Sequence, residues 1–408
     1  MGPAAKRDCA GLLYLEKESL DRRSGFLELA MSVRTDFAAT QYLVDAGAFS
    51  EDPFTLIDVG CRGGIHSRWQ AFGDNLKAYA IDPLIAEIEE LARAEKNPNI
   101  KYWPGYIGLA FDHPVMKSRS ARGPWGNFPW ERLSAAWAAE IMASEVDDEA
   151  ARLERNQWSS ARLTESSNRV GLTEFVRQRE IESVDFIKVD VDGEDLYVLL
   201  SGDDLIRDEE TLGFELEVAF FGTDCESDNT FHNVDRLMRA HGYELFDLSV
   251  RKYSRRTLPA PFVLQMPAQT EWGAPFQGYA LYVRDVAGRA RESNSSRLSN
   301  AKLLKMIAVH ELFGLPDCAA EIAVTFKPQL CAIIDVDHLL DMLTPRLNGQ
   351  PVTYHQYCGE FLADPTRFYP PKPEPAQPLV RKPQNILRRK LSSLKRRLRG
   401  LYVTQHSG

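Results

Sequence analysis

The most constraining feature of this sequence is a regular alternation of short apolar runs and helical stretches between Phe54 and Asp285. Such an alternation predicts a mostly parallel sheet with helices on both faces, because parallel strands need crossover connections that are usually helical. Helices are expected at Ala86–Ala94, Thr173–Arg179, Asp195–Leu200 and Phe231–His241. Seven runs are expected to be strands: Thr55–Val59, Ala78–Ile81, Ile100–Tyr106, Val184–Val189, Thr211–Val218, Tyr243–Leu248 and Tyr279–Val283.

The segments outside this alternation predict further units, for which a chain of 408 residues has room. The aromatic and charged stretch at about 112–170 is too long for a plain connection and is expected to be an insertion over the mouth of the site. The expected organisation is a helical segment at 1–50, an α/β domain at 51–287, a small helical domain at 300–362, a proline-rich linker at 363–384 and a basic amphipathic helix at 385–403.

The composition favours a soluble, cytoplasmic protein. No run approaches the roughly 18 apolar residues that cross a bilayer, and charges interrupt the apolar patch of Met1–Asp21 that a secretory signal would need. The six cysteines form no CxxC pair, so we expect reduced thiols and not a zinc site. The net charge is −9, yet Leu379–Gly408 carries nine Lys or Arg and no Asp or Glu. Only this tail is therefore suited to an anionic partner.

A glycine loop follows the first expected strand. Gly60 comes directly after Val59, and Gly63 and Gly64 follow, so the backbone can approach a ligand closely. The next strand ends at Asp82, about 20 residues after the glycines, the spacing of a carboxylate that accepts from ribose hydroxyls. Both strands end at the same edge of the sheet, where open α/β sheets bind ligands. The sequence therefore predicts a nucleotide-cofactor site.

Asp58 distinguishes between the possible cofactors. A carboxylate two residues before the first glycine would repel the pyrophosphate of a nicotinamide dinucleotide. The sulfonium and amino groups of S-adenosylmethionine meet no such repulsion. The predicted cofactor is S-adenosyl-L-methionine, and the loop predicted to hold it also contains Arg62 and Gly63.

A second cluster of charges lies at the end of the strand that begins at Val184. The period of two in an extended chain places Lys188, Asp190 and Asp192 on one side, and Glu217 on the next strand has the same character. Three interpretations compete: a general base for a hydroxyl acceptor, ligands for a divalent metal, and an ion-pair network around Lys188. The catalytic candidates are Asp190, Asp192 and Glu217; no metal site is predicted.

These motifs resemble the FkbM family of S-adenosylmethionine-dependent methyltransferases over most of Phe54–Asp285. The resemblance is carried by Ile57–Gly64, Ile81–Pro83, Phe186–Glu194, Glu215–Val218 and Gly242–Leu248. It implies the seven-stranded class I methyltransferase sheet and O-methylation of hydroxyls on sugars and secondary metabolites.

The resemblance also implies roles for single residues. Asp58, Gly60 and Gly64 would line the methionine end of the cofactor, and Asp82 would bind its ribose. The sequence departs from the family pattern at Arg62–Gly63, where many members have a small polar pair. It departs again at Asp192, which replaces the usual Glu and keeps its charge.

Several other polar residues could lie near the reaction. His66 follows the glycine loop and could reach the transferred methyl group, or it could cap the adjacent helix. His232, Tyr253, Arg255 and Arg256 could lie near the acceptor or belong to a solvated charged loop.

The basic tail combines its charge with a leucine stripe at steps of four and three residues along 385–403. This pattern predicts a peripheral helix on an anionic membrane, and a solvated or partner-binding helix is the alternative. A nucleic-acid arm would not require the stripe, so no nucleic-acid partner is expected.

The leading hypothesis is a cytoplasmic O-methyltransferase that modifies a small molecule or a glycan at the inner face of the membrane. Two hypotheses of other classes stand beside it. A nicotinamide-dependent oxidoreductase is disfavoured by Asp58, and a non-catalytic binding protein would have its cofactor loop blocked by Arg62.

Overall fold

The computed structural model describes residues 31–32, 36–118, 169–191, 193–253, 270–293 and 298–369. The chain divides into two compact units, Met1–Glu360 and Phe361–Gly408. Several predictions lie outside the described residues: most of the N-terminal segment, most of the insertion, Asp192, the linker and the basic helix.

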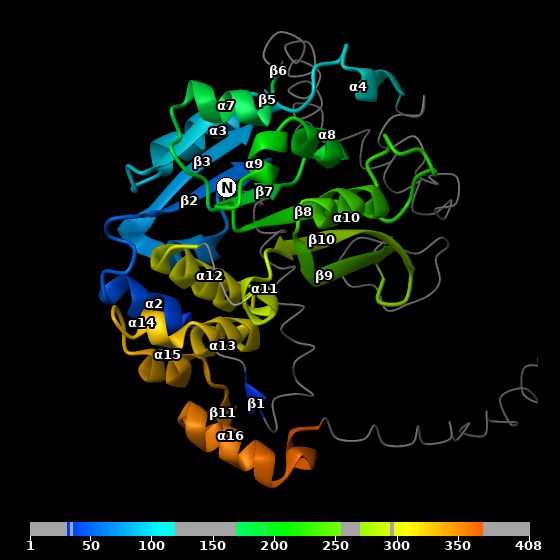
Figure 1. The fold of residues 1–408 in the computed structure, drawn as a ribbon. Coiled ribbons are helices and arrows are strands. Elements are labelled where there is room, and N and C mark those ends of the chain that lie inside the picture. Colours follow the sequence, from blue (N-terminus) through cyan, green and yellow to red (C-terminus); the bar gives the residue numbers. More distant parts are fainter. Residues whose placement is uncertain are drawn as a thin grey trace, which may run out of the picture. The chain divides into compact units, whose positions relative to one another are not determined.

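A seven-stranded sheet forms the centre of the first unit (Figure 1). Its order is β4-β3-β2-β7-β8-β10-β9, and β10 runs antiparallel to both of its neighbours while the other pairs are parallel. All seven predicted strands are confirmed, with bounds that differ by a few residues. They are β2 (Phe54–Val59), β3 (Leu76–Asp82), β4 (Ile100–Pro104), β7 (Phe186–Val189), β8 (Gly213–Ala219), β9 (Glu244–Tyr253) and β10 (Ala274–Val283).

The strand order identifies the type of α/β sheet. Counted along the chain within this sheet, the order is 3-2-1-4-5-7-6, whereas the dinucleotide-binding fold has 3-2-1-4-5-6. The antiparallel β10, inserted between β8 and β9, makes the difference, and it gives the class I methyltransferase arrangement that the sequence predicts. The strand order reverses between β2 and β7, so the crevice for a ligand is expected where these two strands end.

Helices cover both faces of the sheet. One face packs against α7 (Leu172–Gln178), α8 (Asp195–Leu200), α9 (Asp203–Arg207) and α10 (Phe231–Ala240). The other packs against α2 (Ala38–Asp45), η2 (Ser67–Asn75) and α12 (Asn300–Leu312), and α3 (Ile85–Ala94) covers its edge. Helices α3, α7, α8 and α10 confirm the four predicted crossover helices.

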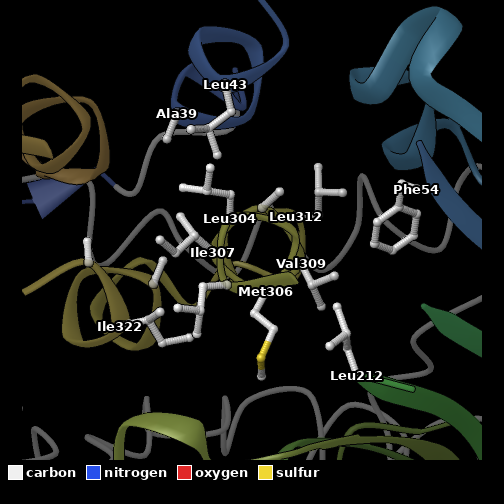
Figure 2. Packing of buried hydrophobic residues seen from close by; sticks show 14 of the residues in the cluster. Ala39, Leu43, Phe54, Leu212, Leu304, Met306, Ile307, Val309, Leu312 and Ile322 are labelled. Atoms are coloured by element: carbon white, nitrogen blue, oxygen red, sulfur yellow. The ribbon is translucent and has the colours of Figure 1, made fainter. Parts of the chain in front are cut away.

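The prediction of a separate helical domain at 300–362 is wrong for most of its length. Residues 300–360 belong to the same compact unit as the sheet, and every residue of α12 from Lys302 to Leu312 is buried. A helix that is buried on all sides belongs to a core. Figure 2 shows Leu304, Leu312 and Val309 of α12 packed among side chains from α2, β2 and the strand edge before β8.

Two lysines of α12 fix this packing. Lys302 Nζ lies 2.8 Å from Asp185 Oδ1, and Lys305 Nζ lies 2.9 Å from Asp185 Oδ2, just before β7. All three side chains are almost fully buried, and Lys305 Nζ also lies 2.6 Å from Asp52 Oδ1. The two ammonium groups therefore depend on these carboxylates for their solvation. In the sequence these lysines resemble the solvated side of a surface helix, which explains the wrong prediction.

The remaining elements are short or peripheral. Within the described part of the chain, no helix is long and apolar enough to cross a membrane. The other helices are α4 (Pro114–Ser118), α11 (Val286–Ser293), α13 (Pro316–Thr325), α14 (Lys327–Leu330), α15 (Val336–Leu343), α16 (Tyr354–Ala363) and η4 (Pro365–Phe368). The other strands pair as β1 (Met31–Ser32) with β11 (Arg346–Leu347) and β5 (Tyr106–Ile107) with β6 (Arg169–Val170).

Candidate functional site

The glycine loop after β2 lies directly against the loop after β7. Gly60 has a φ of +83°, and a Cβ added there would lie 1.8 Å from the carbonyl oxygen of Asp190. The amide of Gly60 donates to the carbonyl of Ile81 at 2.8 Å, and the amide of Asp190 donates to the carbonyl of Val59 at 2.9 Å. Glycine is therefore required at position 60 by both conformation and space. The predicted cofactor loop and the predicted catalytic strand meet here.

The rest of the loop turns toward α3. Gly63 and Gly64 have φ values of +78° and +91°, and the amide of Gly63 donates to Glu87 Oε1 at 2.8 Å. Arg62 Nε lies 3.9 Å from Glu87 Oε2, and its side chain is about half exposed. Arg62, the main departure from the family pattern, is thus engaged by a carboxylate on the first turn of α3.

Asp58 and Asp190 share the ammonium group of Lys188. Asp58 and Lys188 are register partners on β2 and β7, and Lys188 Nζ lies 3.1 Å from Asp58 Oδ1 and 3.5 Å from Asp190 Oδ2. The same ammonium donates to the carbonyl of Gly60 at 2.7 Å. Burial alone would disfavour the charged ammonium, but the two carboxylates outweigh it and raise the pKa of Lys188 well above its usual value. Lys188 is therefore a cation that ties the two loops together.

A tyrosine and an arginine extend this network across the sheet. The hydroxyl of Tyr279 on β10 donates to Asp190 Oδ2 at 3.0 Å, and Arg251 Nη2 donates to the Tyr279 hydroxyl at 3.3 Å. Burial, and after it the charge of Asp190, raises the pKa of Tyr279, so the phenol keeps its proton. No signal in the sequence distinguishes Tyr279 from a core residue of a strand.

Glu217 lies on the next strand and has different partners. Glu217 is the register partner of Tyr279, and its Oε1 accepts from Gln277 Nε2 at 2.8 Å. It lines a pocket together with Gly193, Asp195, Phe221, Asn229 and Gln277. The pocket thus lies beside the ends of β7 and β8, where the sequence predicts the acceptor.

Asp195 shapes one wall of this pocket. Its carboxylate accepts from the amides of Val191 at 3.0 Å and Gly193 at 3.3 Å and from Asn229 Nδ2 at 3.0 Å. Burial raises its pKa to about 7. The carboxylate therefore holds the turn between β7 and α8. The predicted motif ends at Glu194, one residue before Asp195, so the sequence analysis missed this residue. Its position as an acidic residue in the first turn of a helix is the signal that could have identified it.

Asp82 ends β3 one strand away from β2. Its Oδ1 accepts from the amide of Leu84 at 2.9 Å, and its carbonyl accepts from the amide of Gly105 at 3.1 Å. Burial raises the pKa of Asp82 to about 6. This carboxylate lies at the end of the strand beside the glycine loop.

The structure gives positions for three of the other polar residues singled out in the sequence. His66 Nδ1 accepts from the amide of Arg68 at 3.1 Å, so His66 caps η2 as one of its two interpretations predicts. His232 lies 3.4 Å from the hydroxyl of Thr230, and the ring of Tyr253 packs 4.6 Å from that of Phe276. Arg255 and Arg256 lie outside the described residues.

Lys188, Asp58 and Asp190 form an ion-pair network, which is one of the three interpretations of the acidic cluster given by the sequence. Lys188 occupies the space between two carboxylates that a metal ion would need. Within the residues that can be described, which leave out Asp192, no group of three or more His, Cys, Asp or Glu could hold a metal ion. A base for a hydroxyl acceptor is compatible with such a network, because Glu217 and Asp190 lie beside the pocket and the crevice.

Comparisons with solved structures give methyltransferases at low similarity. A TehB-like SAM-dependent methyltransferase from Corynebacterium glutamicum is 10% identical, with 67% of this chain and 99% of that chain covered and a TM-score of 0.23. A 1,6-didemethyltoxoflavin-N1-methyltransferase from Burkholderia thailandensis, solved with 1,6-didemethyltoxoflavin and S-adenosylhomocysteine, is 13% identical, with 69% and 94% covered and a TM-score of 0.22. At such TM-scores neither similarity carries an argument about this chain.

Comparisons at the level of sequence are more specific. No curated protein matches the chain significantly. Residues 142–245 match the family model described as the methyltransferase FkbM domain, and this range contains the Lys188–Glu194 motif and β8. The match confirms the resemblance that the motifs indicate: residues 142–245 of this chain match a methyltransferase domain of the FkbM type.

Proposed function

We propose that the chain transfers a methyl group from S-adenosylmethionine to a hydroxyl of a small molecule, a sugar or a glycan. The observation that carries the proposal is the contact of the Gly60 loop with Asp190 at the point where the strand order reverses. The ligand crevice of this type of sheet opens there. A small pocket lined by Glu217 lies beside it.

The charges at this crevice suit a cationic cofactor. Asp58, Asp82, Asp190 and Glu217 lie at or near the carboxyl ends of four adjacent strands. The cation of Lys188 offsets only part of this charge. A sulfonium with an ammonium group is attracted to such a site, whereas a pyrophosphate is repelled.

The residues present fit the parts of S-adenosylmethionine. The glycine at position 60 lets the loop pack against the Asp190 backbone, and Lys188 ties this loop to Asp58. The loop would hold the methionine end. The Asp82 carboxylate at the end of β3 would accept from the ribose hydroxyls. Arg62, Gly63 and Gly64 would close the loop toward α3, held by Glu87. When bound, the sulfonium supplies an activated methyl group and a neutral leaving group.

The protein then has to orient the acceptor and take its proton. A sugar hydroxyl is a weak acid, so a carboxylate base within hydrogen-bond reach contributes to the rate. Asp190 and Glu217 are the described candidates, and Asp192 remains a prediction outside the described residues. Alignment of the acceptor oxygen with the methyl group would supply much of the remaining acceleration.

Equilibrium binding tests the cofactor. We expect S-adenosylmethionine to bind the purified full chain in calorimetry, NADH not to bind, and Asp82→Asn to weaken binding about tenfold through loss of a charged acceptor. Asp74→Asn, an exposed carboxylate near the end of η2, is the matched control and should bind as the wild type does. Binding of NADH without S-adenosylmethionine would favour the oxidoreductase hypothesis, and binding of neither would exclude the proposed function.

Two further experiments test the acceptor and the location. Transfer of a tritiated methyl group to a panel of methyl glycosides, with catechol as a non-sugar hydroxyl, would identify O-methylation of sugars. The peripheral membrane helix at 385–403 is part of the proposal and rests on the sequence alone. Flotation of the full chain with phosphatidylserine vesicles, compared with a chain that ends at residue 384, would test it.

A further inference from the structure

The backbone amides of the glycine loop are largely engaged within the protein. The amides of Gly60 and Cys61 both donate to the carbonyl of Ile81, at 2.8 and 3.3 Å. The amide of Gly64 donates to the carbonyl of Cys61 at 2.8 Å. The amide of Gly63 donates to a carboxylate oxygen on α3, also at 2.8 Å. These amides already have acceptors, so they are not available to an anionic group of a ligand unless a bond is given up.

The methionine end of S-adenosylmethionine carries a carboxylate, and in an acidic crevice this anion needs a cation beside it. Lys188 is not such a cation. It lies 3.1 Å from Asp58 Oδ1 and 3.5 Å from Asp190 Oδ2, and it also donates to the carbonyl of Gly60 at 2.7 Å. Withdrawal of the ammonium would leave the buried Asp58 without its partner, which is costly. The cofactor carboxylate therefore requires a cation with a partner that is easily exchanged.

Arg62 meets this requirement. Its Nε lies 3.9 Å from Glu87 Oε2, and the two side chains are 47% and 32% exposed. An ion pair that is so long and so open to water contributes little, so its carboxylate can be replaced at small cost. Burial raises the pKa of Asp82, and the positive charge of Arg62 opposes this rise. The guanidinium thus lies within electrostatic range of the end of β3, on the side of the crevice.

We propose that the Arg62 guanidinium binds the carboxylate of the methionine end, exchanging Glu87 for it when the cofactor enters. A guanidinium presents parallel N–H donors that match the two oxygens of a carboxylate. Glu87 is then a positioning residue, which holds the Gly63 amide through its other oxygen. The inference rests on the proposed function. It gives a role to the residue at which the sequence departs from the family pattern.

A matched pair of ligands isolates the carboxylate. S-adenosylhomocysteine and its decarboxylated analogue are both thioethers with an amine, and only the first has a carboxylate. The ratio of their Kd values, measured by calorimetry on the full chain, reports the preference for the carboxylate. Arg62→Gln should reduce this preference about tenfold, because a hydrogen bond between two charged groups is lost. Arg62→Lys should retain part of it, since lysine keeps the charge without the planar fork.

Two further variants serve as control and as test of the exchange. Arg93→Gln is the matched control, because Arg93 is an exposed arginine on α3 that donates to the carbonyl of Glu89, and its preference should equal that of the wild type. Glu87→Gln keeps an acceptor for the Gly63 amide and removes the charge that competes for Arg62. It should increase the preference by about two- to fivefold, and it should have no such effect in the Arg62→Gln background.

The outcomes separate this inference from the proposed function. An unchanged preference in Arg62→Gln overturns the inference while the proposed function stands. Equal effects of Glu87→Gln in both backgrounds would reduce Glu87 to simple repulsion of the ligand and refute the exchange. A wild type that binds neither ligand refutes the proposed function itself. Each readout is a ratio of two affinities of one variant, so partial unfolding is not mistaken for loss of the contact.

Discussion

Gly60 and Asp190, 130 residues apart in the chain, are in contact: a Cβ on Gly60 would overlap the carbonyl oxygen of Asp190 at 1.8 Å. The contact joins the loop after β2 to the loop after β7 at the reversal of the strand order. This close approach excludes any side chain at position 60. The glycine loop and the acidic end of β7 are therefore packed directly against each other.

Substitution of two glycines in this loop should therefore have unequal effects. Gly60→Ala should abolish S-adenosylmethionine binding, because the new Cβ displaces the Asp190 backbone. Gly63→Ala places its Cβ where no atom lies within 4 Å, so only the φ of +78° opposes it, at a cost of about 1 kcal/mol. Calorimetric Kd values and urea unfolding of both variants check this. Equal Kd values for the two would contradict the close approach.

Cofactor binding should depend on pH through Asp82. Its pKa is raised by burial to about 6, so its carboxylate is charged above this pH and becomes a protonated acid below it. We expect the affinity for S-adenosylmethionine to fall roughly tenfold from pH 7 to pH 5, as the charged fraction falls by that factor. In Asp82→Asn this component of the pH dependence should be absent. A wild-type profile parallel to that of Asp82→Asn would show that Asp82 does not bind the cofactor.

The buried ion pairs between α12 and the sheet should be essential for stability. Asp185→Asn leaves Lys302 and Lys305 buried with less negative charge, and removal of one partner of a buried pair costs about 3 to 5 kcal/mol. Asp203→Asn, which removes the half-exposed pair with Arg207 and the contact with His241, should cost less than about 0.5 kcal/mol. The free energy of unfolding in urea measures both. Comparable losses in the two variants would refute this account.

Stability at acid pH should depend on His310. Burial lowers its pKa to about 4 from the usual 6.5, and its Nδ1 atom has no hydrogen-bond partner among the residues of known placement. The unfolded chain binds a proton between these values that the folded chain does not, so stability falls as the pH falls from 6.5 to 4. The loss is at most roughly 3 kcal/mol. Asp82, whose pKa is raised, contributes the opposite slope between about 4 and 6.

Comparison of His310→Leu with the wild type isolates this contribution. The variant should lose less stability between pH 7.5 and pH 5 than the wild type does, as measured by urea midpoints at both values. Asp82→Asn serves as the control for the opposing slope. If His310→Leu loses as much stability between pH 7.5 and pH 5 as the wild type does, His310 is not the source of the pH dependence.

Local patterns were sufficient for the strands and for the residue types of the site. The run Phe54–Val59 is mostly apolar and is followed by glycine, so its pattern indicates a buried strand and a turn wherever it lies in the fold. The same reasoning failed for α12. Lys302 and Lys305 are charged, and nothing in the sequence shows that both of them form ion pairs with the buried Asp185.

The sequence by itself determined the class I sheet, the glycine loop and the acidic strand ends, because these depend on periodicity and on residues adjacent in the chain. Only the tertiary structure decided the partners of those acids. Tyr279 and Gln277 lie on the antiparallel strand β10, and their contacts with Asp190 and Glu217 arise from strand register across the sheet. Register is a relation between distant segments, so the hydrogen-bond partners of these two carboxylates became known only once the strands were paired.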